Sequence, residues 1–166
     1  MERNKVIKRK FKISEVKEKI SKYADIIFSF EHDEHNIIPK DCYEVRVDSH
    51  SKDDIEVYSV FFNDIVFELF FNIRKVYSDY LGDYLNSKNK IEVNINITDD
   101  EIVFSNNKAG LIYVSDFNVC NLANRIRDRG RVKGLNLINS LSEILFNKKI
   151  NIVYRDDKFI TSIPLQ

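Results

Sequence analysis

Apolar residues recur at intervals of three and four along three segments of the chain, which is the spacing of one face of an α-helix. The first helix follows Ser14, which is a suitable N-cap. The second is predicted over 54–81 with Ser51 or Asp53 as its cap, and the third over 134–146. Their apolar faces consist of Val16, Ile20, Tyr23, Ile27 and Phe30, then Tyr58, Phe61, Phe62, Ile65, Leu69, Ile73, Val76 and Tyr80, and finally Leu137, Leu141, Ile144 and Leu145. The width of the second face predicts a central, mostly buried helix.

Strands are predicted where apolar and polar residues alternate. The predicted strands are 5–11, 42–47, 90–97, 101–106, 149–154 and 159–165. The last four form two hairpins, because polar turn residues at 98–100 and 155–158 separate each pair. Segment 31–41 is predicted to be an exposed loop, and 108–133 has mixed polarity without a clear period.

This order of elements predicts an α+β fold. We expect a two-layer α/β sandwich, in which helices cover one face of a mixed, mainly antiparallel sheet. With 166 residues, the chain is long enough for one domain with a full core. Within that single domain, we expect 1–50 to form a strand/helix/strand extension that packs on a core made of 51–166.

Composition narrows the class of protein. No apolar run of 18 residues is present to span a bilayer, and the basic segment 1–12 lacks the apolar core of a signal peptide. We therefore expect a cytoplasmic protein without membrane contact. Lys+Arg and Asp+Glu number 26 each, so no overall charge attracts nucleic acid. Cys42 and Cys120 are too few and too far apart for a disulfide framework or a zinc knuckle, and we interpret them as buried thiols.

A polar stripe runs along the second predicted helix. Its members lie within about 80° of one another at 100° per residue. They are Asp64, Glu68, Asn72, Lys75 and Asp79. One interpretation is the solvated edge of a core helix. The other is a phosphate site, because a carboxylate and a carboxamide one turn apart can orient a water and complete a magnesium shell, while a lysine neutralises phosphate.

Four segments, in their order along the chain, resemble the motifs of one family. Segment 68–75, ELFFNIRK, looks like the asparagine box of the GHKL ATPases, which include histidine-kinase ATP-binding domains, anti-sigma-factor kinases, gyrase-type topoisomerases and mismatch-repair ATPases. Segment 102–110, IVFSNNKAG, resembles the first glycine box of that superfamily, and 134–141, GLNLINSL, resembles the second. Segment 149–165 resembles the closing hairpin. The resemblance covers 54–165, and its layout is closest to histidine-kinase ATPase domains and anti-sigma-factor kinases.

The resemblance implies a Bergerat-type ATP-binding fold that uses ATP and Mg²⁺. Asn72 matches the asparagine that coordinates magnesium bound to the phosphates. Glu68 matches the glutamate that, in the topoisomerase and anti-sigma branches, acts as a general base on water or on a protein hydroxyl. Lys75 matches a basic position near the phosphates. The implied activity is hydrolysis of ATP or transfer of its γ-phosphate to a partner protein.

The glycine boxes depart from the family pattern. Asn106 stands where the family has the adenine-binding aspartate, so the amide oxygen can accept a hydrogen bond from adenine but without the charge. Gly110 and Gly134 keep glycine where the backbone approaches the nucleotide. Lys108 replaces the middle glycine of the first box, where its ammonium could instead contact phosphate, and Asn136 replaces the second glycine of the second box. The positions that the resemblance assigns to ATP are Asn72, Lys75, Asn106, Lys108, Gly110, Arg131, Gly134, Leu135 and Asn136.

A basic cluster lies between the two glycine boxes, where the resemblance places the ATP lid. It consists of Arg125, Arg127, Arg129, Arg131 and Lys133. These residues can clamp phosphates through bidentate hydrogen bonds. They can equally form an exposed basic helix end or a patch for an acidic partner. Nucleic acid is disfavoured as a ligand, because no aromatic residues alternate with the arginines.

Three functions are compared, and the first is favoured over the second. The first is a stand-alone GHKL enzyme that acts on ATP and on a partner protein, such as a regulatory or effector subunit. The second is a degenerate, non-catalytic module of the same fold that works through protein–protein contacts. The third is a small nucleic-acid-binding protein. A complete sensor kinase is not predicted, because His32 and His35 lie in the predicted loop without a helical hairpin. Whether the chain forms a homodimer stays open.

Overall fold

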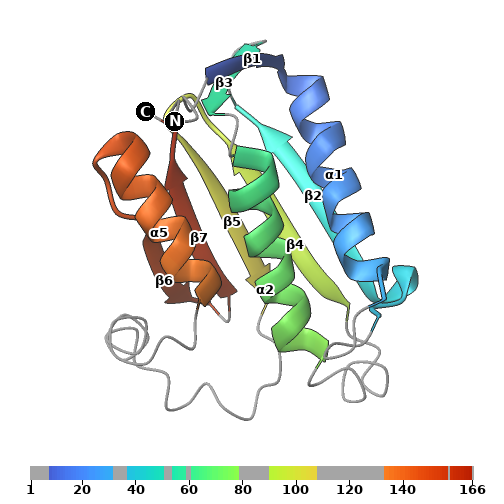
Figure 1. The fold of residues 1–166 in the computed structure, drawn as a ribbon. Helices are drawn as coiled ribbons and strands as arrows, with labels where there is room; N and C mark the ends of the chain where they lie inside the picture. Colours follow the sequence, from blue (N-terminus) through green and yellow to red (C-terminus); the bar gives the residue numbers. More distant parts are fainter. Residues whose placement is uncertain are drawn as a thin grey trace, which may run out of the picture.

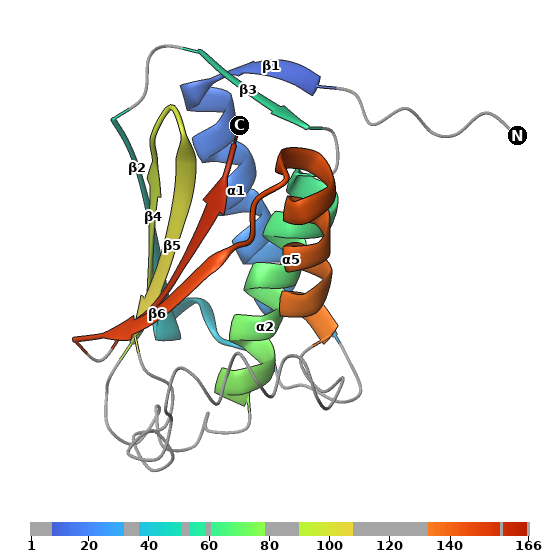
Figure 2. The ribbon, with the colours of Figure 1, turned by 90° about the vertical axis from the view of Figure 1, so that its left-hand side faces the viewer.

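A computed structural model of the chain describes residues 8–31, 37–50, 54–58, 61–78, 90–107, 133–156 and 158–165. These residues form two layers, with a sheet on one side and helices on the other (Figures 1 and 2). The predicted α+β two-layer sandwich is therefore confirmed. None of the helices formed by these residues is long and apolar enough to span a membrane.

The main sheet has five strands in the order β2-β4-β5-β7-β6. The bounds are β2 (Tyr43–Ser49), β4 (Ile91–Ile97), β5 (Glu101–Asn107), β6 (Asn151–Arg155) and β7 (Lys158–Pro164). The pair β2 and β4 is parallel, and the other neighbours are antiparallel, so the sheet is mixed and mainly antiparallel as predicted. Both predicted hairpins are confirmed: β4 joins β5, and β6 joins β7.

The helical layer contains α1 (Ile13–Ser29), a π-helical turn η2 (Phe61–Val66) that leads into α2 (Phe67–Ser78), and α5 (Lys133–Phe146). All of them cover the same face of the main sheet (Figure 2). Helix α1 begins one residue before Ser14, and its N-cap is Lys12, so the predicted cap is wrong. The reason is local: Lys12 ends the strand before the helix, and its backbone N–H donates to the Glu15 carboxylate at 3.0 Å.

The prediction of one helix over 54–81 is wrong at its beginning. Residues 54–58 form a strand, β3 (Asp54–Tyr58), which pairs antiparallel with β1 (Lys8–Lys12). Segment 54–58 alternates polar and apolar residues, and its apolar residues Ile55 and Val57 are buried. Pairing with a strand more than 40 residues away in sequence decided the structure here, and it removes Tyr58 from the predicted helical face. The candidate caps at 51–53 and the end of the predicted helix at 79–81 lie outside the described residues.

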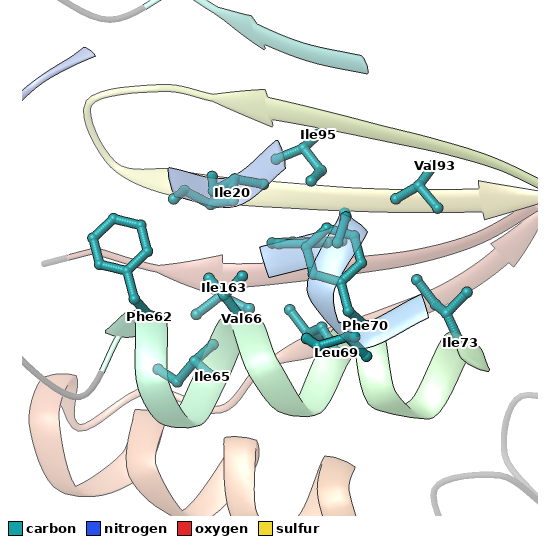
Figure 3. Packing of buried hydrophobic residues seen from close by; sticks show 14 of the residues in the cluster. Ile20, Phe62, Ile65, Val66, Leu69, Phe70, Ile73, Val93, Ile95 and Ile163 are labelled. Atoms are coloured by element: carbon teal, nitrogen blue, oxygen red, sulfur yellow. The ribbon is translucent and has the colours of Figure 1, made fainter. Parts of the chain in front are cut away.

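The core fills the space between the two layers. From η2 and α2, Phe62, Val66, Phe70 and Ile73 project toward Val93 and Ile95 of β4 and Ile163 of β7 (Figure 3). The Phe70 ring meets those of Phe28 and Phe104 edge to face, each with centroids 5.8 Å apart. The prediction of a mostly buried central helix is therefore confirmed over residues 62–74, where the structure describes the side chains.

The segment after α1 is not uniformly exposed. The short 3₁₀ turn η1 (Lys40–Cys42) precedes β2, and Ile38 before it is buried, with its N–H donating to the Phe28 carbonyl at 2.9 Å. The predicted exposed loop over 31–41 is therefore wrong at Ile38. Cys42 is half-buried against the core, while Cys120 and residues 32–36 lie outside the described part of the chain.

Candidate functional site

Two residues of the predicted polar stripe share one side of α2. Glu68 and Asn72 are four positions apart, so their side chains lie one helical turn from each other. At 100° per residue, they lie about 160° and 200° around the helix from Phe70, which faces the sheet. Both side chains are half-buried. The helix therefore has a core side and, opposite to it, a polar side.

The chemistry of this polar side is unusual for a solvated edge. The Asn72 Nδ2 group is buried, and no described residue accepts a hydrogen bond from it. An unmade hydrogen bond at a buried donor costs about 1–3 kcal/mol, and an oxygen of a bound ligand would supply the acceptor that the Asn72 amide lacks. Burial raises the pKa of Glu68, and the carboxylate of Asp64, one turn before it, raises that pKa further. A carboxylate with a raised pKa is a stronger base when ionised.

Asn106 lies at the end of β5, on the helix-covered face. The buried residues Ile102 and Phe104 show which face this is, because side chains alternate along a strand and Asn106 is two positions beyond Phe104. The Asn106 Nδ2 donates to the Asn107 carbonyl at 3.2 Å. This bond orients the carboxamide, so that Oδ1 is the atom left to accept from a ligand. The Phe104 ring contacts Phe70 of α2, so β5 and α2 meet two residues before Asn106.

Asn107 holds the end of β5 in place, a role that our sequence analysis missed. Its Oδ1 accepts from the Glu92 N–H at 2.9 Å, and its Nδ2 donates to the Lys90 carbonyl at 2.8 Å. The side chain thus joins the end of β5 to the beginning of β4 through two hydrogen bonds. The doublet of asparagines at 106–107 was the available signal, but only the strand pairing shows that one of them is structural.

The elements that carry the predicted site converge at one end of the molecule. Figure 1 shows the end of α2, the end of β5 and the beginning of α5 at the same edge of the fold. Gly134, Leu135 and Asn136 lie in the first turn of α5, and Lys75 lies in α2, although the structure does not describe the side chains of Leu135, Asn136 and Lys75. The predicted residues that lie outside the described part of the chain are Lys108, Gly110 and Arg131, together with the rest of the basic cluster except Lys133.

Asn72 is the described residue whose chemistry fits a magnesium ion that is held jointly with phosphate. Among the described residues, no group of three or more His, Cys, Asp or Glu side chains is placed to bind a metal ion. Mg²⁺ is usually bound through one or two protein oxygens together with substrate phosphates. The Asn72 carboxamide fits this pattern, because its oxygen can take a metal position while its buried N–H can donate to a phosphate oxygen.

Comparisons with known proteins agree with this architecture at the level of the fold. No family model and no curated protein sequence matches the chain. Among solved structures, the nucleotide-free catalytic domain of histidine kinase ThkA is similar with a TM-score of 0.59 and 15% identity, over 96% of this chain and 98% of that chain. The histidine kinase AdeS of Acinetobacter baumannii is similar with a TM-score of 0.57 and 11% identity, over 98% of this chain and 68% of that chain. The chain therefore has the fold of histidine-kinase catalytic domains.

Proposed function

We propose that the chain binds Mg-ATP at the polar side of α2 and either hydrolyses it or passes its γ-phosphate to a partner protein. The observation that carries this proposal is the pair Glu68 and Asn72, one turn apart, with a buried and unpartnered amide on Asn72. The pair lies in a chain whose fold is that of histidine-kinase catalytic domains.

Each described residue has a distinct role in this proposal. The Asn72 carboxamide supplies one ligand oxygen for magnesium and one donor to phosphate. Bound Mg²⁺ neutralises charge on the phosphates. Glu68 accepts the proton of the attacking water or hydroxyl, and its raised pKa strengthens it as a base. Asn106 accepts from the adenine amino group through Oδ1, which its bond to Asn107 leaves available.

The remaining predicted positions complete the proposed site. Lys75, Lys108 and Arg131 neutralise phosphate charge. Gly110 and the first turn of α5, with Gly134, Leu135 and Asn136, allow close approach of the backbone to the nucleotide. The proposed partner is another protein, a regulatory or effector subunit, with a homodimer still open. The proposed site of action is the cytoplasm, where ATP and magnesium are both abundant. The division into 1–50 and 51–166 stays a prediction.

The test is calorimetric titration of ATP, with and without magnesium, on the wild type and on Asn72→Ala. We expect magnesium-dependent binding to the wild type and a loss of that dependence in Asn72→Ala. Asn94→Ala is the matched control, because Asn94 is a half-buried asparagine of β4 on the sheet face without helices. The proposal fails if millimolar ATP with magnesium neither releases heat nor raises the melting temperature of the wild type.

A degenerate, non-catalytic module is the second candidate. Asn106 favours it, because a neutral carboxamide replaces the charged acceptor and its Nδ2 is already bonded to Asn107. In this case the fold serves protein–protein contacts, and wild type and Asn72→Ala give the same flat titration with ATP. A difference between the two titrations contradicts this candidate.

A further inference from the structure

Arg74 is a completely buried arginine in the helix that carries the proposed site. Its side chain lies on the side of α2 that faces α1, and none of it is exposed to solvent. The Nη1 group donates to the Ile27 carbonyl at 2.6 Å, and the guanidinium carbon lies 4.4 Å from the centre of the Phe30 ring. Burial lowers the pKa of Arg74, but an arginine remains charged near neutral pH. A buried charge is costly unless it is hydrogen-bonded. Because another position of the side chain would break the bond to Ile27, this bond and the contact with Phe30 fix where the guanidinium lies.

The carbonyl that Arg74 contacts is one that α1 cannot satisfy by itself. The last four carbonyls of a helix have no partner within the helix. At the end of α1, the Ile26 carbonyl accepts from the Phe30 N–H, and the Phe28 carbonyl accepts from the Ile38 N–H. The Ile27 carbonyl between them accepts from Arg74. Arg74 thus caps α1 with a cation at the negative end of its dipole, and this cap belongs to α2.

The contact anchors α2 on the side opposite to Asn72. Two residues along a helix correspond to about 200° around its axis, so Arg74 and Asn72 point in nearly opposite directions. The Phe71 ring adds to the anchor by stacking on Phe30 with centroids 6.5 Å apart. A rotation of α2 by about 20° would move a side-chain atom about 6 Å from the axis by about 2 Å. Displacements of about 1 Å at a reacting group can cost about 100-fold in rate.

We propose that Arg74 is a positioning residue for the nucleotide site, because joining α2 to the end of α1 sets the rotation of α2 and thereby the place of the Asn72 carboxamide. This inference rests on the proposed binding of Mg-ATP by Asn72. The end of α1 then has a role besides core packing. A substitution there would shift Arg74 and, through it, the polar side of α2.

A double-mutant cycle on Mg-ATP affinity tests the inference. The cycle compares wild type, Asn72→Ala, Arg74→Met and the double variant by calorimetry, well below the melting temperature of each. We expect Arg74→Met to weaken Mg-ATP binding about tenfold in the wild type and less than about twofold in the Asn72→Ala background. We expect Arg74→Lys to recover part of the affinity, because it keeps a cation that can donate to the Ile27 carbonyl.

The control separates positioning from general destabilisation. Val16→Ala removes two fully buried methyl groups from α1 and leaves Arg74 unchanged, so it should lower the melting temperature and leave Mg-ATP affinity unchanged. If Arg74→Met does not fold, Arg74→Lys takes its place in the cycle. Equal losses in the two backgrounds, or a loss of the same size in Val16→Ala, would overturn the positioning role while leaving Mg-ATP binding intact. A wild type that does not bind Mg-ATP overturns both proposals.

Discussion

The two sides of α2 show how one helix separates stability from chemistry. On the sheet side, Phe70 and Ile73 are buried among residues of the main sheet and α1, and they contribute apolar area. On the opposite side, Glu68 and Asn72 are half-buried, and they contribute a carboxylate with a raised pKa and an amide without a partner. The residues of the first side pack within the fold, whereas on the second side the Asn72 amide has no hydrogen-bond partner. Substitutions on the sheet side should therefore lower the stability of the fold, while substitutions on the polar side should lower binding or turnover of ATP.

The sharpest test of the core side is Phe70→Ala. The substitution removes both edge-to-face contacts and leaves a cavity between the layers. We expect the free energy of unfolding to fall by about 3–5 kcal/mol in chemical denaturation. Phe70→Leu, which keeps most of the volume, should cost clearly less. A loss below about 1 kcal/mol in Phe70→Ala would show that Phe70 is not a central core residue.

Glu68→Gln addresses the polar side. The variant keeps the size of the side chain and removes the base, so turnover of Mg-ATP should fall by at least about 100-fold. Its affinity for Mg-ATP, measured by calorimetry, should stay close to that of the wild type. Glu18→Gln on the exposed face of α1 is the control and should turn over ATP normally. Unchanged turnover in Glu68→Gln would remove Glu68 from the proposed mechanism.

Asn106→Asp extends the comparison to the strand that ends beside α2. A charged acceptor makes a stronger hydrogen bond than a neutral one by about 1 kcal/mol, so affinity for ATP should rise about fivefold. Selectivity for ATP over GTP, measured by competition, should rise as well. Asn94→Asp on the other face of the sheet should change neither value. A drop in ATP affinity in Asn106→Asp would argue against adenine at this position.

The smallest expected effect concerns pH. Because the folded protein raises the pKa of Glu68, it binds that proton more tightly than the unfolded chain does. Ionised Glu68 therefore destabilises the fold, and this cost develops as pH rises from the unfolded pKa toward the raised value. Solvent screens a half-exposed carboxylate, so Glu68→Gln should gain only a few tenths of a kcal/mol at neutral pH and nothing at pH 3. Chemical denaturation of the wild type and Glu68→Gln at pH 3 and at neutral pH measures this difference. A lower stability of Glu68→Gln at neutral pH would contradict the expected direction.

Local patterns were sufficient for the parts of the fold that depend on neighbours in sequence. Both hairpins form at the predicted places, because alternation and a polar turn act within about 15 residues. The turn of the first hairpin is closed by Thr98, whose N–H and hydroxyl both donate to the Glu101 carbonyl. The apolar face from Phe62 to Ile73 likewise predicted a buried helix, because the helical pattern involves only residues three or four positions apart in sequence.

Prediction failed where distant segments meet. Residues 54–58 carry apolar residues that fit either a helix or a strand, and pairing with β1 decided for the strand. Ile38 follows a polar segment, and it is buried in the core, with its N–H bonded to the end of α1. In the candidate site, the order of the motifs predicted Glu68, Asn72 and Asn106, while the bonds of Asn107 to Lys90 and Glu92 could not be inferred before strand register was known.

By itself, the sequence determined the fold class and the polar residue types on α2, because both follow from periodicity along single segments. It also placed glycines and asparagines in an order that resembles a nucleotide site. Only the tertiary structure decided that Arg74 is buried against the end of α1, that Asn106 turns to the helix-covered face, and that Asn72 keeps a buried amide without a partner. The physical reason is that burial and hydrogen-bond satisfaction depend on neighbours brought together by folding, which no local pattern contains.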